Sequence, residues 1–303
     1  MEDHKQHLAY LAAMGHTMIT GLSFMFLKIG LNISNPWDVL AYRFTASFLV
    51  LLIPILFKWI KLDLNREKII KVLPLAIFYP MLFFATQTFG LQYLTSSESA
   101  ILFAMMPIFT LILATYFLRE ETTLLQKLSV MLSVAGVVYI TLHKGSSFEF
   151  KNVMGISLIL LSALSFSIYS IMVKKLTKSS TILEMTYMMI IISFIFFNAM
   201  SIGRHMLNGT ISTFWEPLYQ PRFIMAVVYL GVLSSLATSL LANYALSKID
   251  ASKMCVFTNL STVISIIAGV VFLNENIYYY HIIGSILIIS GVVGTNCLCK
   301  RNR

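Results

Sequence analysis

The chain has 303 residues, of which 58% are apolar and only 12% are charged, and its net charge is +9. Soluble domains are about a quarter charged, so a soluble fold of this length could not bury so much apolar side-chain surface. The composition therefore excludes a soluble globular protein and predicts an integral membrane protein.

Ten apolar runs follow one another along the chain, separated by short connections. Each is roughly 18 to 23 residues long, enough to cross a bilayer core of about 30 Å as a helix. The runs lie at about 8–28, 37–59, 69–91, 97–118, 123–142, 154–173, 181–202, 221–241, 252–273 and 279–298. The first run is too long for a signal peptide and lacks a small-residue cleavage site, so we expect a retained span. The sequence thus predicts an all-α integral membrane protein with ten transmembrane helices.

Lysine and arginine are distributed unevenly between alternate connections. Of the 22 such residues, 16 lie on the side that holds both termini, 5 lie on the other side, and Arg43 alone lies within a span. Positively charged loops mark the cytoplasmic side of a membrane protein. We therefore expect both termini in the cytoplasm and the protein in the plasma membrane. Short basic clusters between apolar runs suit anionic lipid better than nucleic acid.

One phrase occurs in both halves of the chain. Phe-Leu-x-Glu stands at 117–120 and again at 272–275, a shift of 155 residues. This shift also aligns Ser97 with Ser252, Ser129 with Gly284, Gly136 with Gly291 and Val137-Val138 with Val292-Val293, and a shift of 146 aligns Lys28 with Lys174 and Asp38 with Glu184. Each half holds five spans, an odd number, so the second repeat (147–303) should cross the membrane inverted relative to the first (1–146). Inverted repeats are typical of secondary transporters.

Four stretches carry a family resemblance: AYRF (41–44), GLQYLTSSESAILFAMMPIFTLILATYFLREE (90–121), NYALSKIDASKMCVFTNLSTVISIIAGVVFLNENI (243–277) and GVVG (291–294). As an ordered set they resemble the drug/metabolite transporter superfamily, in particular its ten-span EamA-type members. The resemblance implies a transporter of small metabolites, often an exporter, with a cavity lined mainly by helices 1, 3, 4, 6, 8 and 9. Because Thr262 stands where the first half has Pro107, a helix break is expected in the first half only.

Five charged residues are candidates for gating or for structural roles. Glu120 and Glu275 end their spans on opposite faces of the membrane, where a carboxylate either gates or caps the next helix. Arg43 either binds an anionic substrate or holds its position by snorkelling or by carbonyl bonds. Glu98 and Lys253, paired by the repeat, stand at the two predicted mouths of one cavity or are simply interfacial. Glu98 is also our first candidate for steering a cationic substrate or carrying a coupling proton.

Uncharged polar and aromatic side chains are the candidates for lining the cavity. An Asn or Gln in a membrane helix must find a partner in another helix or in a substrate, and Tyr and Met make an adaptable pocket for an amphipathic molecule. The set comprises Tyr79, Gln87, Tyr93, Met105, Tyr169, Asn243, Tyr244, Thr258 and Asn259. His16, in the middle of the first span, either relays protons or forms a hydrogen bond across helices.

Motifs for other kinds of function are missing from the sequence. It has no H-E-x-x-H, G-x-S-x-G or Walker motif, and Cys297 and Cys299 have no nearby ligand partners, so we expect neither an enzyme nor a metal or cofactor site. We interpret the chain as a secondary transporter, an exporter of an amino acid or related amphipathic compound. Multidrug efflux is the alternative, and a receptor or scaffold without transport is a further one. A monomer is favoured, and the substrate and coupling ion stay open.

Overall fold

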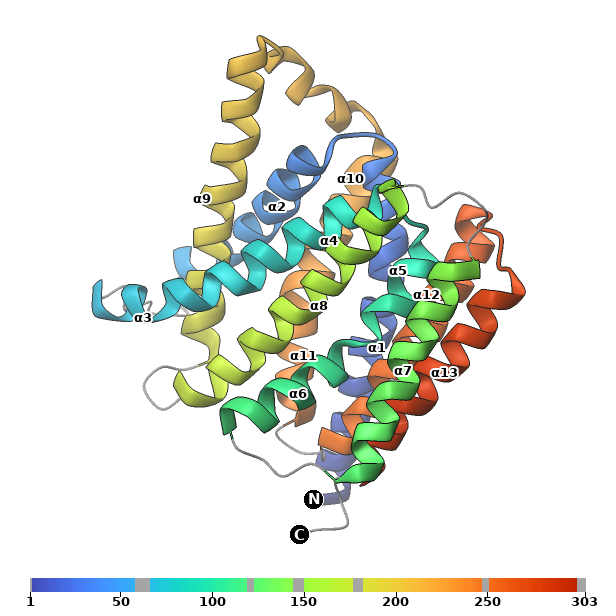
Figure 1. The fold of residues 1–303 in the computed structure, drawn as a ribbon. Coiled ribbons are helices and arrows are strands. Elements are labelled where there is room, and N and C mark those ends of the chain that lie inside the picture. The colour runs from blue at the N-terminus through green and yellow to red at the C-terminus, as the bar shows by residue number, and fades with distance from the viewer. Residues whose placement is uncertain are drawn as a thin grey trace.

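The structure, a computed structural model, describes residues 2–57, 66–118, 123–143, 150–176, 182–246 and 251–298. These residues form helices joined by short turns (Figure 1). In chain order the elements are α1 (Glu2–Leu31), α2 (Pro36–Leu56), α3 (Arg66–Ala76), η1 (Ile77–Leu82), α4 (Phe83–Leu91), α5 (Ser96–Phe103), α6 (Met106–Leu118), α7 (Leu124–His143), α8 (Phe150–Leu176), α9 (Ile182–Asn208), η2 (Ile211–Phe214), η3 (Glu216–Tyr219), α10 (Pro221–Val228), η4 (Tyr229–Ala237), α11 (Thr238–Leu246), α12 (Ala251–Leu273) and α13 (Tyr279–Leu298).

Six helical stretches of the described chain are long and apolar enough to cross a membrane. They are His7–Leu31, Pro36–Pro54, Val72–Leu91, Ser96–Phe117, Phe150–Met172 and Glu184–Asn208. A seventh candidate is a pair of segments, Ile211–Tyr219 and Pro221–Ala237, bent by 91° where they join. Three shorter apolar helices complete the set: Leu124–Ile140, Leu260–Leu273 and Tyr279–Gly294. The prediction of an all-helical, multi-pass membrane protein is confirmed.

The distribution of side chains is that of a protein dissolved in lipid. Large apolar residues lie on the outside, for example Met131 on α7, which is 68% exposed, and Ile267 on α12, which is 56% exposed. Small hydroxyl residues on the same helices, Ser133 and Ser265, are fully buried. Small residues let membrane helices approach closely, and the Ser133 hydroxyl also donates a hydrogen bond to the Ile288 carbonyl of a neighbouring helix, so this pattern is typical of helix packing in a bilayer.

The helix break predicted at Pro107 is present. Proline has no N–H and its ring crowds the preceding turn, so a helix cannot pass through it undisturbed. Helix α5 ends at Phe103, Ala104 and Met105 form a turn, and α6 starts at Met106. In the second half, α12 runs unbroken from Ala251 to Leu273 through Thr262. The break occurs in one half only, as expected.

Two further irregular segments were not predicted. η1 and η4 are π-helical, and Tyr79 in η1 has an extended backbone (φ −143°, ψ 121°) directly before Pro80, a position that disfavours the helical conformation. In η4 the Ser235 hydroxyl donates to the Leu230 carbonyl at 3.0 Å. The 155-residue shift places η1 on residues 232–237, inside η4. Both halves are therefore irregular at equivalent positions, and π-helical turns frequently mark functional sites.

Helices α7 and α13 lie side by side (Figure 1) and meet through small residues. A Cβ atom added to Gly136 would lie 2.9 Å from the Gly284 carbonyl oxygen, and one added to Gly291 would overlap Ser129 and Ser133. The repeat pairs Gly136 with Gly291 and Ser129 with Gly284, so each contact is the image of the other.

Candidate functional site

Helix α5 begins with a capping box that is buried in the protein. The Thr95 hydroxyl accepts from the Glu98 N–H at 3.1 Å, and the Glu98 carboxylate accepts from the Thr95 N–H at 3.0 Å. This reciprocal pairing satisfies two N–H groups that every helix start leaves free. The Glu98 side chain is 4% exposed. In this structure it is therefore a buried helix cap.

A second carboxylate reaches the same helix end from the other half of the chain. Glu275, directly after α12, accepts from the Ser96 N–H at 2.6 Å, the Ser97 N–H at 3.0 Å and the Ser97 hydroxyl at 2.6 Å. Asn274 adopts the left-handed conformation (φ 53°) that turns the chain back at the end of a helix. Glu275 thus caps α5, far away in the sequence, and not the next helix, α13. The helix dipole and two backbone donors favour a negative charge here.

His281 on α13 joins this group through Glu98. Its Nε2 lies 3.2 Å from Glu98 Oε1, and its Nδ1 accepts from the Tyr278 N–H at 3.2 Å. Because Nδ1 accepts a hydrogen bond, the ring proton belongs on Nε2, from which neutral His281 donates to the carboxylate. We call Ser96, Ser97, Glu98, Glu275 and His281 the cap cluster. It links α5 of the first half to α12 and α13 of the second.

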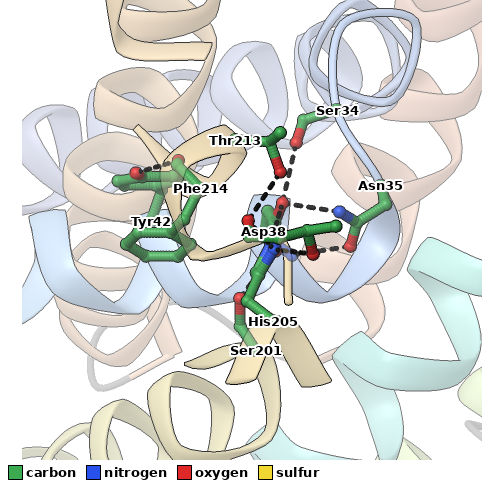
Figure 2. A network of polar contacts seen from close by, with 9 residues as sticks. Ser34, Asn35, Asp38, Tyr42, Ser201, His205, Thr213 and Phe214 are labelled. Atoms are coloured by element: carbon green, nitrogen blue, oxygen red, sulfur yellow. Dashed lines mark hydrogen bonds and ion pairs between the residues drawn. The ribbon is translucent and has the colours of Figure 1, made fainter. Parts of the chain in front are cut away.

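A second histidine–carboxylate pair joins the two halves at Asp38 of α2 and His205 of α9 (Figure 2). His205 Nε2 lies 3.1 Å from both carboxylate oxygens, and its Nδ1 lies 2.8 Å from the Thr210 carbonyl oxygen. Nδ1 also lies 2.9 Å from the Thr210 hydroxyl, so the imidazole links the Asp38 carboxylate of α2 to the turn that follows α9. Ser201 and Asn35 also donate to Asp38. The pair is buried, with 2% and 5% of its two residues exposed.

Arg43 lies at the junction of the two irregular segments. Its Nε donates to the Ser235 hydroxyl at 3.1 Å and its Nη2 to the Ser234 hydroxyl at 3.3 Å, both in η4. Its guanidinium carbon lies 3.8 Å above the centre of the Phe84 ring. Phe84 is the second residue of α4, the helix that directly follows η1. At 1% exposure, Arg43 does not snorkel to a membrane surface. We call Arg43, Phe84, Ser234 and Ser235 the arginine site.

Aromatic rings surround one side of the arginine site. The Tyr79 ring centre lies 5.4 Å from that of Phe84, 5.2 Å from Phe166 and 4.8 Å from Tyr169. Two predicted cavity residues, Tyr79 and Tyr169, are therefore brought together from different helices. Both are half-buried. An aromatic wall beside a cation is suited to a small ligand with an anionic group and an apolar body.

The other predicted residues are dispersed. His16 lies 3.3 Å from the Thr238 carbonyl oxygen across the two halves, Gln87 and Met105 are buried, and Tyr244 is 39% exposed on α11. Half-buried Tyr93 borders a polar pocket that Gln92, Lys151 and Asn152 also line. The side chains of Asn243, Lys253, Thr258 and Asn259, and the whole of Glu120, lie outside the described part of the chain.

The partners of several predicted residues lie far from them in the sequence and were not predicted. His205 and His281 are isolated histidines in the sequence, and their carboxylates lie 167 and 183 positions away. Ser96 and Ser97 donate to Glu275, which lies 179 and 178 positions away from them. The capping box at Thr95 and Glu98, by contrast, has a local T-x-x-E signature that identifies it as a helix start.

The family of this chain is found by comparison with known proteins. The model of the EamA-like transporter family matches residues 7–142 and again residues 153–297. The chain belongs to the EamA-like transporter family. One match lies in the first half of the chain and the other in the second half.

Relatives of this EamA-like protein carry transporter names. "Uncharacterized transporter YcxC" of Bacillus subtilis is 48% identical over 296 residues, which cover 98% of this chain and 95% of that protein. An "Uncharacterized transporter" of Archaeoglobus fulgidus is 28% identical over 90% of this chain and 92% of its own. A solved structure titled "Crystal structure of protein" aligns with a TM-score of 0.63 over 97% of this chain and 98% of its own, at 16% identity. That last likeness supports the fold alone.

Proposed function

We propose that the protein exports a small metabolite, an amino acid or a related amphipathic compound, across the plasma membrane by alternating access. In this mechanism two inverted halves rock about a site near the membrane midplane. In this proposal the protein crosses the membrane ten times, through the six long helices, the bent pair and the three shorter apolar helices described above. Both termini face the cytoplasm, as the distribution of lysine and arginine indicates.

One observation carries the proposal. The Ser133 hydroxyl on α7 donates to the Ile288 carbonyl on α13 at 3.0 Å, and these two residues are separated by the 155-residue repeat. A residue that contacts its own equivalent lies on a two-fold axis. The reciprocal glycine contacts on either side fit the same axis. The contacts progress in opposite directions along α7 and α13, so these two equivalent helices are antiparallel. This arrangement supports the proposal that the two halves have opposite orientations in the membrane.

The cap cluster supplies a candidate gate. Glu275 of the second half closes onto the α5 start of the first half, at the end of the bundle that we expect to face outward. By the repeat, Glu120 corresponds to Glu275, and residues 251 and 252 at the start of α12 correspond to 96 and 97. We assign the two carboxylates to opposite gates, with Glu275 closing the outer one and Glu120 the inner one. Each half then locks the other in turn.

The test begins with cells that contain or lack the protein. Comparison of their metabolites should reveal a compound that accumulates inside cells without the protein and appears in the medium of cells that overproduce it. Purified protein in liposomes should then move that compound down its gradient or against a driving ion. A compound that binds without crossing the liposome membrane would indicate a receptor, and no redistributed compound and no flux would overturn the proposal.

A further inference from the structure

Arg43 is a buried cation without a protein anion in the described part of the chain. The nearest acid along α2, Asp38, is bonded to His205, and Glu98 and Glu275 both cap α5. Its hydrogen bonds go to two neutral serines. Burying a charge in a membrane protein is costly, and such charges normally pair with an anion or mark a substrate path. Two hydroxyl groups do not neutralise it.

The hydrogen bonds of the Arg43 guanidinium use only one of its two edges, and we call the other the open edge. Arginine has five N–H donors in a planar fork. The serines occupy the edge formed by Nε and Nη2, so the edge formed by Nη1 and the second Nη2 proton has no hydrogen bond from the described residues. That edge has the spacing to bind both oxygens of one carboxylate. Phe84 covers one face of the same group and fixes its plane.

The position of Arg43 suits a substrate site. It connects η4 of the second half, through Ser234 and Ser235, to the start of α4 of the first half, directly after η1. Gly231 allows this approach, because a Cβ there would lie 2.5 Å from the Arg43 carbonyl oxygen. Secondary transporters bind substrates between interrupted helices of the two halves, near the midplane.

We propose that Arg43 binds the carboxylate of the transported compound, and that Phe84, Tyr79, Phe166 and Tyr169 contact its aromatic or branched apolar body. That the bound compound is transported rests on the proposed function, whereas the binding site itself rests on the geometry around Arg43. The substrate class is therefore a small amphipathic monocarboxylate. An uncharged or cationic compound of the same shape would leave the open edge of Arg43 unpaired and would bind poorly.

Direct binding to purified protein tests this site without any flux. The probes are 3-phenylpropanoate, indole-3-acetate and 4-methylpentanoate, each compared with its own carboxamide, which keeps the shape and removes the charge. Calorimetry should detect binding of at least one acid, with its amide at least tenfold weaker. Acids and amides that bind equally well, or no binding by any of the three acids, would overturn the proposal.

Variants assign the effect to the arginine. Arg43→Lys keeps the charge but loses the fork, so the acid should bind at least tenfold more weakly, whereas Arg204→Lys on the exposed surface of α9 should change nothing. If Arg43→Lys does not fold, Phe84→Leu leaves the charge in place and should still weaken acid binding several-fold. Unchanged binding in the folded variant overturns the site. Acid binding without flux in liposomes would instead contradict transport, and flux of a compound without a carboxylate would contradict only the site.

Discussion

Ser133 donates a hydrogen bond to the carbonyl oxygen of Ile288, the residue that corresponds to it in the second half of the chain. On either side of this pair, Gly136 faces Gly284 and Gly291 faces Ser129. In a membrane, helices associate through such close packing, because lipid provides no hydrophobic drive toward burial. The contact between α7 and α13 is therefore where the two halves are most directly held together.

Enlarging Gly136 should separate these helices. A Cβ at this position would lie 2.9 Å from the Gly284 carbonyl oxygen and 2.9 Å from the Ile288 side chain, so Gly136→Leu should reduce stability by about 3 kcal/mol and lower the yield of folded protein. Gly203 on α9 has no atom within 4 Å of its added Cβ, which makes Gly203→Leu the matched control. Size-exclusion profiles of both variants in detergent check the prediction. Equal yields would contradict it.

Removing the imidazole of His205 should leave the buried Asp38 carboxylate without one of its hydrogen-bond partners. We expect His205→Leu to lower the free energy of unfolding by about 1–3 kcal/mol, the usual cost of leaving a buried polar group unsatisfied. Adding Asp38→Asn should recover part of the loss, since an amide is less costly than a carboxylate to leave without a partner in a buried position. His143→Leu, at an exposed histidine, is the control. Denaturant unfolding should measure the free energy of unfolding of the parent protein, both single variants and the double variant. An equal loss in His205→Leu and His143→Leu would contradict the prediction.

Glu98→Gln should act on stability through the cap. Both Glu98 oxygens accept N–H hydrogen bonds, from Thr95 and from His281, and glutamine would turn an NH2 group toward one of these donors. A loss of about 1–2 kcal/mol in the free energy of unfolding is expected. Flux of the identified metabolite should keep its dependence on pH between 5 and 8. Normal stability with a lost pH dependence would instead identify Glu98 as the carrier of a coupling proton.

Glu275→Gln should weaken the outer gate. Its ionised carboxylate accepts two backbone N–H groups and a hydroxyl at the α5 start, and loss of one charged cap is worth about 1–2 kcal/mol. The ratio of closed to open outer gate should therefore fall by roughly 5- to 30-fold. Thiol labelling of an internal cysteine from the outer face would report this change as a faster rate. Glu216→Gln, at an exposed glutamate of η3, should leave the rate unchanged.

The features that sequence analysis predicted are the local ones. Apolar runs identified the helices. Pro107 in the first half, with Thr262 at the equivalent position of the second, predicted a break in one half only, because a proline without an N–H disrupts the helical turn in which it lies. Gly231, in the π-helical segment η4, packs against α2, a tertiary contact that no local pattern encodes. Glu275 was expected to gate or to cap the next helix, whereas it caps α5, where its partner Ser97 lies 178 residues away and beyond the reach of a local pattern. Arg43 was predicted to lie within a span, with snorkelling left open, and its serine partners belong to the π-helical segment η4, which was not predicted.

The central claim, alternating access to a site at Arg43, is tested most directly by labelling a cysteine there from each side of the membrane. Ser234→Cys, in a protein whose three native cysteines are replaced by serine, places the thiol beside the guanidinium. A membrane-impermeant thiol reagent is applied to right-side-out and to inside-out vesicles. Leu207→Cys, 90% exposed at the predicted outer end, confirms that the vesicles are sealed. We predict that Ser234→Cys reacts from both faces and that Glu275→Gln speeds the reaction from the outer face alone. Reaction from one face only, unaffected by Glu275→Gln, would contradict alternating access.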